Sequence, residues 1–311
     1  SVDKHAQRTA FITESGVEIS YAQFDRYANR VAHWALAQGV KPGDTVALYM
    51  ANRWEYVAIW FGLSKVGIMG ALLNNQITGQ SLAHCIDVSE AAHVIVEGEL
   101  AEQYETACAL INCKLTPWVS DGKQAKAPGG QDFDAALSGQ SDVRPDRSYR
   151  AHLKASDPCM KMYTSGTTGL PKAAIVAHTR ALYYLQVFGV AGHADKDDRM
   201  MMVLPMYHAT GGLCGVGAAL SFGGAVIVRR KFSATRFWKD AADTGATMLM
   251  YVGELCRFLV AAEPSEWEKK HKIRIAIGNG LRPDVWPRFV ERSGIPRIME
   301  FYGATEGNVG L

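Results

Sequence analysis

The sequence carries almost no net charge, because 33 Lys and Arg residues are offset by 31 Asp and Glu residues, leaving +2. It also contains no conspicuous basic run, so we expect no nucleic-acid partner. Its six cysteines include no C-x-x-C pair, which argues against a zinc site or a thioredoxin-like motif and favours a reducing compartment. No G-x-S-x-G motif occurs, so a serine hydrolase of the nucleophile-elbow type is unsupported.

Signals for export or membrane insertion are weak. The polar first eight residues contain no signal-peptide core, and the chain begins with Ser1, which indicates a processed or trimmed start. The longest apolar stretch, 56–73, carries Lys65 at its middle. A central lysine costs about 2.5–3.5 kcal/mol on insertion scales. We therefore predict a buried helix followed by a strand, and a cytoplasmic protein with at most peripheral membrane association.

What the chain does have is ordinary globular composition, with 48% apolar and 21% charged residues over 311 positions. Short β-rich runs alternate with amphipathic helical stretches, which is typical of an α/β fold with parallel sheets. No internal repeat is evident. The predicted strands are 45–50, 68–73, 92–96, 160–164, 173–177, 200–204, 225–228, 247–251, 273–277 and 297–301.

A composition shift toward Gly, Pro, Asp, Ser and Gln over 121–150 marks a lobe boundary or a surface excursion. We expect two lobes, approximately 1–155 and 156–311. In such folds ligands bind at loops beyond the carboxyl ends of the strands.

The loop 163–172, YTSGTTGLPK, concentrates hydroxyl residues, glycines and a lysine between two predicted strands. Glycines let backbone N–H groups approach an anion, and hydroxyls and lysine add donors, as a polyphosphate requires. It is not a Walker A loop, because Pro171 precedes Lys172 and Ala173 follows it. The alternative interpretation is a flexible Ser/Thr/Gly turn.

Three further strand ends carry candidate chemistry. Gly278-Asn279-Gly280 imitates the start of a dinucleotide fingerprint, but a tight turn into a helix near Pro283 explains it equally well. Residues 301–307, FYGATEG, offer an aromatic ring for a base, a threonine for phosphate and a carboxylate for Mg²⁺. His208, in the loop 204–212, can touch a carboxylate or phosphate, although an isolated histidine is more often structural.

Together these loops resemble, in order and approximate spacing, the adenylate-forming superfamily of acyl-CoA synthetases, luciferases and peptide-synthetase adenylation domains. The nearer resemblance is to the fatty-acid transport protein and very-long-chain acyl-CoA synthetase branch. It rests on KFSA at 231–234, RFW at 236–238, YVGELCR at 251–257 and GNGLR at 278–282. The resemblance implies the parallel-sheet lobes of a large N-terminal adenylation domain over 1–311. A β-rich third subdomain and a C-terminal lid would be absent, and the fragment alone is expected to be inactive.

The resemblance also implies roles for individual residues. Residues expected to bind ATP are Thr164, Ser165, Gly166, Thr167, Thr168, Gly169, Lys172, Gly278, Asn279, Gly280, Tyr302, Gly303, Ala304 and Thr305. Among these, Tyr302 would stack on adenine, and Thr305 would contact the α-phosphate. Residues expected to act in catalysis are Lys172, His208, Thr305 and Glu306, with Glu306 holding Mg²⁺. Residues expected at the acyl substrate are His208, Gly211, Tyr251, Gly253 and Glu254, and the small size of Gly211 and Gly212 suggests room for a long chain.

The implied activity is the activation of a long- or very-long-chain fatty acid by ATP and Mg²⁺, through an acyl-adenylate, to its coenzyme A thioester. Its partners would be small molecules. Three alternatives remain open at this point. The chain can be a membrane-bound fatty-acid carrier, a ligase for a bile-acid-like, aromatic or carnitine-like acid, or a non-catalytic nucleotide sensor.

Overall fold

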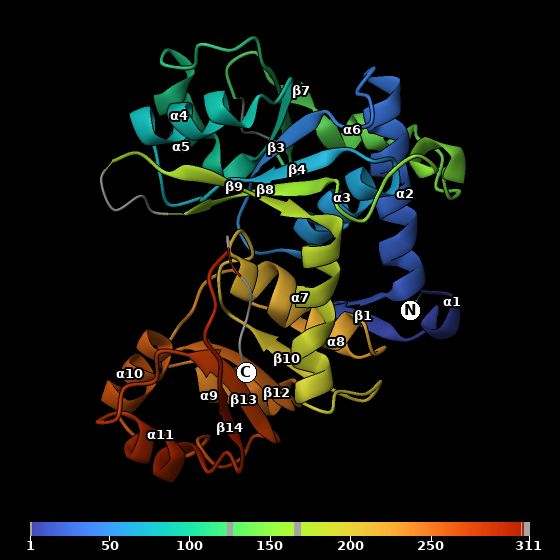
Figure 1. The fold of residues 1–311 in the computed structure, drawn as a ribbon. Coiled ribbons are helices and arrows are strands. Elements are labelled where there is room, and N and C mark those ends of the chain that lie inside the picture. The colour runs from blue at the N-terminus through green and yellow to red at the C-terminus, as the bar shows by residue number, and fades with distance from the viewer. Residues whose placement is uncertain (1, 123–126, 165–168, 306, 308–311) are drawn as a thin grey trace. The chain divides into compact units, whose positions relative to one another are not determined.

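Figure 1 presents the computed structural model of the chain, in which residues 2–122, 127–164, 169–305 and 307 are described. Its contacts divide it into two units. We call Gln23–Ala181 the central unit, and Ser1–Ala22 together with Leu182–Leu311 the terminal unit. This division differs from the expected lobes 1–155 and 156–311, because an N-terminal strand pairs within the terminal unit while strands up to residue 177 pair within the central one.

The sheet of the central unit has seven strands in the order β7-β6-β5-β3-β4-β8-β9. Its strands are β3 (Thr45–Tyr49), β4 (Met69–Leu72), β5 (His93–Glu97), β6 (Thr116–Ser120), β7 (Gln131–Asp132), β8 (Pro158–Thr164) and β9 (Lys172–Ala177). All neighbours run parallel except β8 and β9, which form an antiparallel hairpin. The helices are α2 (Tyr21–Ala37, whose first two residues fall in the terminal unit), α3 (Trp54–Lys65), α4 (Gly79–Ser89), α5 (Ala101–Cys108) and α6 (Phe133–Ser138).

Side-chain alternation along these strands builds a core on each face of the central sheet. On one face Ala47 and Val94 pack in a cluster with Leu82 of α4 and Ala107 of α5. On the other face the ring of Trp34 from α2 meets those of Trp118 and Phe133 edge-on, at centroid distances of 5.2 and 4.9 Å. The buried helix and strand expected within 56–73 are confirmed as α3 and β4.

The terminal unit repeats this plan with the strand order β14-β13-β12-β10-β11-β1-β2. Its strands are β1 (Thr9–Ile12), β2 (Glu18–Ser20), β10 (Arg199–Met202), β11 (Ala225–Val228), β12 (Met248–Val252), β13 (Ile275–Asn279) and β14 (Ile298–Glu300). Among the described strands of this unit, β1 and β2 pair antiparallel and the other neighbours run parallel. The helices are α1 (Val2–His5), α7 (His178–Ala191, which starts in the central unit), α8 (Val216–Leu220), α9 (Phe237–Asp243), α10 (Gly253–Ala261) and α11 (Trp286–Ser293).

The two sheets share one topology that the sequence did not reveal as a repeat. In the central sheet β3 lies between β4 and β5, and in the terminal sheet β10 lies between β11 and β12. An antiparallel hairpin, β8–β9 or β1–β2, extends each sheet beyond β4 or β11. In each sheet the direction in which successive strands are added therefore reverses once, at the strand where the chain crosses to the other side. The crevice outside the carboxyl ends of the strands at that reversal is the usual ligand position. In the terminal unit the reversal lies between β10 and β12.

The expected α/β fold with mainly parallel sheets is confirmed, with two local corrections. The hairpins β1–β2 and β8–β9 are antiparallel because short loops join them, and only a longer crossover can join parallel neighbours. The helix expected near Pro283 instead begins at Trp286, with Pro287 in its first turn. Among the described residues, none of the helices combines the length and the apolar character needed to cross a bilayer.

Candidate functional site

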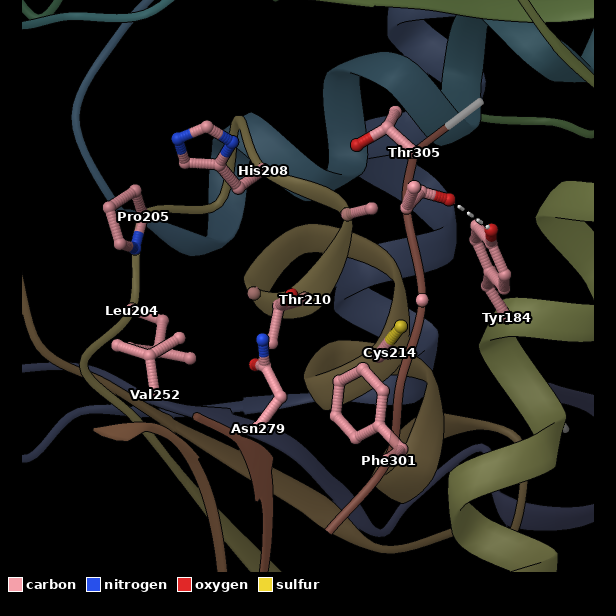
Figure 2. A pocket seen from close by; sticks show the side chains of 14 residues that line it. Tyr184, Leu204, Pro205, His208, Thr210, Cys214, Val252, Asn279, Phe301 and Thr305 are labelled. Carbon is pink, nitrogen blue, oxygen red and sulfur yellow. Dashed lines mark hydrogen bonds between the residues drawn. The ribbon is translucent and has the colours of Figure 1, made fainter. Parts of the chain in front are cut away.

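A cavity of about 470 Å³ lies in the terminal unit, where the carboxyl ends of β12 and β13 meet the segments that follow β10 and β14. Figure 2 shows its lining, with contributions also from α7 and from a π-helix at Ala209–Gly215. The lining residues are Tyr184, Leu204, Pro205, His208, Ala209, Thr210, Gly211, Cys214, Val252, Asn279, Phe301, Gly303, Ala304 and Thr305. The structure thus brings together six predicted site residues: His208, Gly211, Asn279, Gly303, Ala304 and Thr305.

The π-helix explains two glycines differently from the sequence reasoning. A Cβ at Gly211 would overlap the carbonyl oxygen of Pro205, and a Cβ at Gly212 would overlap that of Met206. The expectation that these glycines leave room for an acyl chain is therefore wrong, because backbone already fills the space. Their small size allows this π-helix to pack against the segment after β10, and such π segments are frequent at functional sites.

His208 precedes this π-helix, and its carbonyl accepts a hydrogen bond from the Gly212 N–H at 2.7 Å. Its ring lies exposed at the rim of the cavity, against the ring of Tyr207. Partial desolvation lowers the pKa of His208 below its ordinary value. The imidazole is therefore neutral at pH 7, with one N–H donor and one acceptor nitrogen.

Asn279, the last residue of β13, points into the cavity (Figure 2). Its side-chain Oδ1 is buried and has no hydrogen-bond partner among the described residues. A buried carbonyl oxygen without a donor costs free energy, so a ligand that supplies an N–H or O–H there gains a partner already in place. The site residues therefore fit a ligand with a hydrogen-bond donor, such as the amino group of adenine.

The chain after β14 runs along the opposite wall as Phe301, Gly303, Ala304 and Thr305. The Tyr184 hydroxyl on α7 donates to the carbonyls of Ala304, at 3.1 Å, and Gly307, at 2.7 Å. Phe301 packs on Phe188 of the same helix, with ring centroids 4.5 Å apart. Sequence reasoning missed Tyr184, because its partners lie more than a hundred positions away. The helix α7 also carries apolar residues on its exposed face, such as Leu182 and Val190, so no local pattern marks Tyr184 as buried.

Tyr302, expected to stack on adenine, is 85% exposed and does not line this cavity. Its ring is therefore unburied. Glu306, the expected Mg²⁺ ligand, lies outside the described residues. The part of the chain that the structure describes contains no cluster of three His, Cys, Asp or Glu side chains able to hold a metal.

Four other expected site residues, Tyr251, Gly253, Gly278 and Gly280, do not line the cavity but belong to the strands and turns that support it. Tyr251 is fully buried, and its hydroxyl donates to Glu300 at 2.7 Å. Gly278 and Gly253 have no space for a side chain, because a Cβ would overlap Tyr251 or the carbonyl of Gly280 respectively. Gly280 itself adopts a left-handed φ of +75°, which favours glycine. The expectation that Tyr251 and Gly253 line an acyl channel is not met in this cavity.

Glu254 does not line this cavity either. It is exposed in the first turn of α10 and forms an ion pair with Arg257, three residues along the helix. The neighbouring charge and hydrogen bond lower the pKa of its carboxyl.

The predicted phosphate loop belongs to the central unit. Thr164 ends β8 and pairs across the hairpin with Lys172, the first residue of β9. Lys172 is exposed, and His84 of α4 donates from Nε2 to the Pro171 carbonyl at 3.0 Å. Gly169 is also exposed, with open space where a side chain would be. Ser165, Gly166, Thr167 and Thr168 lie outside the described residues.

Comparison with known proteins agrees with this geometry. The model of the AMP-binding enzyme family matches residues 1–311. The chain is 38% identical to the long-chain fatty acid transport protein 6 of Mus musculus over 97% of its own length, and equally identical to protein 1 of the same species over 99%. The chain spans about half of each of these relatives, 48% of their length.

A solved structure supports the fold. The benzoate CoA ligase from Burkholderia xenovorans superposes with a TM-score of 0.84 at 20% sequence identity, covering 98% of this chain and 59% of the ligase. The likeness at this identity concerns the fold alone. Because the family model matches this chain from residue 1 to residue 311, the chain belongs to the AMP-binding enzymes.

Proposed function

We propose that this chain is the nucleotide- and acid-binding part of a fatty acid–CoA ligase, which uses ATP to form an acyl-adenylate and then passes the acyl group to coenzyme A. One observation carries the proposal. The cavity at the β10–β12 reversal combines an apolar wall with His208, Asn279 and Thr305, and the Oδ1 of Asn279 has no partner among the described residues.

In the first step the site must hold a carboxylate next to the α-phosphate of ATP, although both groups are negatively charged and repel each other. A carboxylate oxygen attacks the α-phosphorus of ATP, the bond to pyrophosphate breaks, and negative charge grows on the phosphate oxygens. Preorganised donors aimed at that charge lower the barrier, and the loss of one donor typically costs about 10²–10³ in rate. In the second step the thiol of coenzyme A displaces AMP from the acyl carbon.

We assign these tasks to the chain's own residues as follows. Thr305 donates to the α-phosphate from the cavity wall that Tyr184 fixes, and neutral His208 lies beside the acyl carboxylate, which it can contact without an added proton. Asn279 accepts from the base. Thr164 and Lys172, paired at the mouth of the β8–β9 loop, bind the outer phosphates together with that loop.

Mg²⁺ would be held by Glu306 and the ATP phosphates, where it supplies charge neutralisation between the phosphates. Carboxylate and phosphate oxygens are the donors this ion prefers, so the proposed set is chemically suitable. The described residues then contribute orientation of the two substrates and exclusion of water from the apolar part of the cavity.

The names of the relatives favour a long-chain fatty acid as the substrate. The apolar residues Leu204, Val252 and Cys214 at the wall suit a hydrocarbon. Bile-acid-like, aromatic and carnitine-like acids are the competing acid classes.

The test is thermal stabilisation of the purified chain by non-hydrolysable acyl-sulfamoyl adenosines with short, long and aromatic acyl groups. A ligand that binds only the native state stabilises it by about 2.7 kcal/mol at 100 times Kd. We expect a melting temperature that rises most with long acyl groups. If a folded α/β chain gains no stability from any analogue, the proposed nucleotide and acid site is wrong.

A second candidate, fatty-acid uptake, is favoured by the word transport in the relatives' names. A carrier binds free fatty acid without nucleotide. Stabilisation by a long-chain fatty acid alone, with no response to the adenosine analogues, would support the carrier over the ligase.

A further inference from the structure

Three residues on neighbouring strands form a row behind the cavity. In the strand register Tyr251 of β12 pairs with Gly278 of β13, and Gly278 pairs with Glu300 of β14. Gly278 carries no side chain, and a Cβ there would overlap the Tyr251 ring. The ring therefore reaches past the glycine, and its hydroxyl donates to Glu300 Oε1 at 2.7 Å.

The Glu300 carboxylate also holds the backbone that follows Asn279. Its Oε2 accepts from the Gly280 N–H at 3.1 Å, and its Oε1 accepts from the Leu281 N–H at 2.9 Å. A carboxylate that accepts from two successive backbone N–H groups fixes the turn containing them. Asn279 lies directly between this turn and its strand, and it is the residue whose Oδ1 is unpartnered in the cavity.

We propose that Glu300 and Tyr251, meeting over Gly278, form a brace that positions Asn279 toward the base of the bound nucleotide. Neither residue lines the cavity, so both are positioning residues and not catalytic ones. The inference rests on the proposed function, since it takes the nucleotide as the ligand. It assigns to Glu300, Tyr251 and Gly278 a common role that no local motif reveals.

The phenol is suited to this role because it stays a donor. Burial, together with the adjacent Glu300 carboxylate, raises the pKa of Tyr251 far above its ordinary value. The hydroxyl is therefore protonated at neutral pH, and Phe at this position removes the donor while keeping the ring.

The chain offers a matched control for that substitution. Tyr21 is equally buried in the terminal unit, and its hydroxyl donates to Gly224 O at 2.7 Å and to Leu220 O at 3.2 Å. Tyr251→Phe and Tyr21→Phe each delete one buried hydroxyl with a carbonyl or carboxylate partner, so both should lower the melting temperature. Only Tyr251→Phe should weaken AMP binding, by about fivefold, which corresponds to one hydrogen bond.

Amide hydrogen exchange gives a readout that needs no ligand. In Tyr251→Phe the Gly280 and Leu281 amides should exchange faster, while amides of β10 and β11 keep their protection. In Glu300→Gln the Gly280 amide should show the largest increase in exchange rate, because an –NH₂ group in place of Oε2 cannot accept the hydrogen bond from the Gly280 N–H. Tyr21→Phe should leave the 280–281 turn protected.

The outcomes separate this inference from the proposed function. If the unsubstituted chain binds AMP and Tyr251→Phe binds it as tightly as Tyr21→Phe does, the brace has no positioning role. Unchanged exchange at Gly280 and Leu281 in both Tyr251→Phe and Glu300→Gln overturns the brace itself. If the unsubstituted chain binds neither AMP nor the adenylate analogue, the proposed function fails first and the positioning toward a nucleotide fails with it.

Discussion

The two sheets share their strand order, but the residues at their reversal points differ: one reversal borders a cavity and the other carries a cluster of charged side chains. In the terminal unit the carboxyl ends of β10 and β12 border the cavity. In the central unit the corresponding ends of β3 and β5 carry Arg53 and Glu97, which pair at 3.3 Å. Arg53 also contacts Glu55 at 2.9 Å and Asp121 at 3.4 Å, and Glu97 accepts from the Ala51 N–H at 2.7 Å.

The difference shows how to tell a structural polar cluster from a binding site on the same topology. At the central reversal Arg53 pairs with the surrounding carboxylates, and a Cβ at Gly98 would be too close to the carbonyl of Asp121. The buried Tyr27 hydroxyl beside this cluster also has no hydrogen-bond partner among the described residues, but it does not line the cavity of the terminal unit. At the terminal reversal Asn279 has a buried oxygen without a partner among the described residues. A satisfied network specifies the fold, whereas an unsatisfied group beside a cavity indicates a ligand. Four sets of substitutions test this contrast and the site assignments that depend on it.

The largest effect is expected from Arg53→Ala. Its side chain is 14% exposed, and that of Glu97 only 1%, so removal of the guanidinium takes the Arg53 charge away from a buried carboxylate, which keeps its hydrogen bond from the Ala51 N–H. We expect a loss of about 3 kcal/mol in the free energy of unfolding, measured by urea denaturation, with AMP affinity unchanged. Lys239→Ala, which breaks an exposed pair with Asp243, is the control and should cost about 0.5 kcal/mol or less. Equal losses in the two variants would contradict a structural role for the central network.

Lys172→Ala should weaken Mg-ATP binding about tenfold or more, because a charge-assisted contact to phosphate is lost. Its exposure means that the free energy of unfolding should change by less than about 0.5 kcal/mol. Glu306→Gln should weaken binding in the same direction through the metal. Isothermal titration measures both, with the exposed Lys154→Ala as the control. Unchanged affinity in both Lys172→Ala and Glu306→Gln would refute the phosphate assignment.

Asn279→Ala should lower AMP affinity about fivefold without a loss of stability, because the deleted carbonyl oxygen has no partner to lose. The buried Asn52, which follows β3 at the central reversal, provides the contrast. Asn52→Ala should destabilise the chain and leave AMP affinity unchanged. Titration and urea unfolding of both variants decide the matter, and a destabilised Asn279→Ala with normal affinity would reverse our assignment.

The smallest effect concerns His208 and pH. Its folded pKa is lowered, so the folded state binds fewer protons than the unfolded state between that pKa and the ordinary value of about 6.5. The contribution of His208 to stability is therefore present above about pH 6.5 and is lost as the pH falls through the folded pKa. His93, His178 and His271 also have lowered pKa values, so the difference between the unsubstituted chain and His208→Gln isolates the effect. A His208 proton resonance that titrates at or above its ordinary pKa would exclude this behaviour.

Much of the fold followed from local patterns. The strand β11 was predicted with its observed bounds because AVIV is a run of apolar, mostly β-branched residues, and the α/β class followed from the alternation of strands and helices. The strand β1 was missed although it is as long as β11, because its sequence TAFI is a weaker strand signal than AVIV and its partner β11 is distant in the sequence, with Phe11 opposite Val226. Short strands owe their existence to such distant pairing, which a local window does not contain.

The site divides in the same way. Asn279, His208 and Thr305 were predicted, since each follows a recognisable strand end. Glu300 was not predicted, because its role depends on Tyr251, which lies two strands away and reaches it across Gly278 of the strand between them. Gly211 and Gly278 were predicted as site residues for the wrong reason, because a missing side chain can serve backbone contact as well as a ligand.

The pairing of β1 with β11 has a consequence for how the chain is made. During synthesis β1 leaves the ribosome long before β11, the strand beside which it lies in the folded chain. Its backbone groups on that side therefore have no strand to pair with until about two hundred further residues have been made. Gln23–Ala181, by contrast, contains every strand of its own sheet and can complete that sheet while translation continues. A cut or a bulky tag near residue 10 would therefore damage the sheet of the terminal unit, most of whose strands are translated after those of the central sheet.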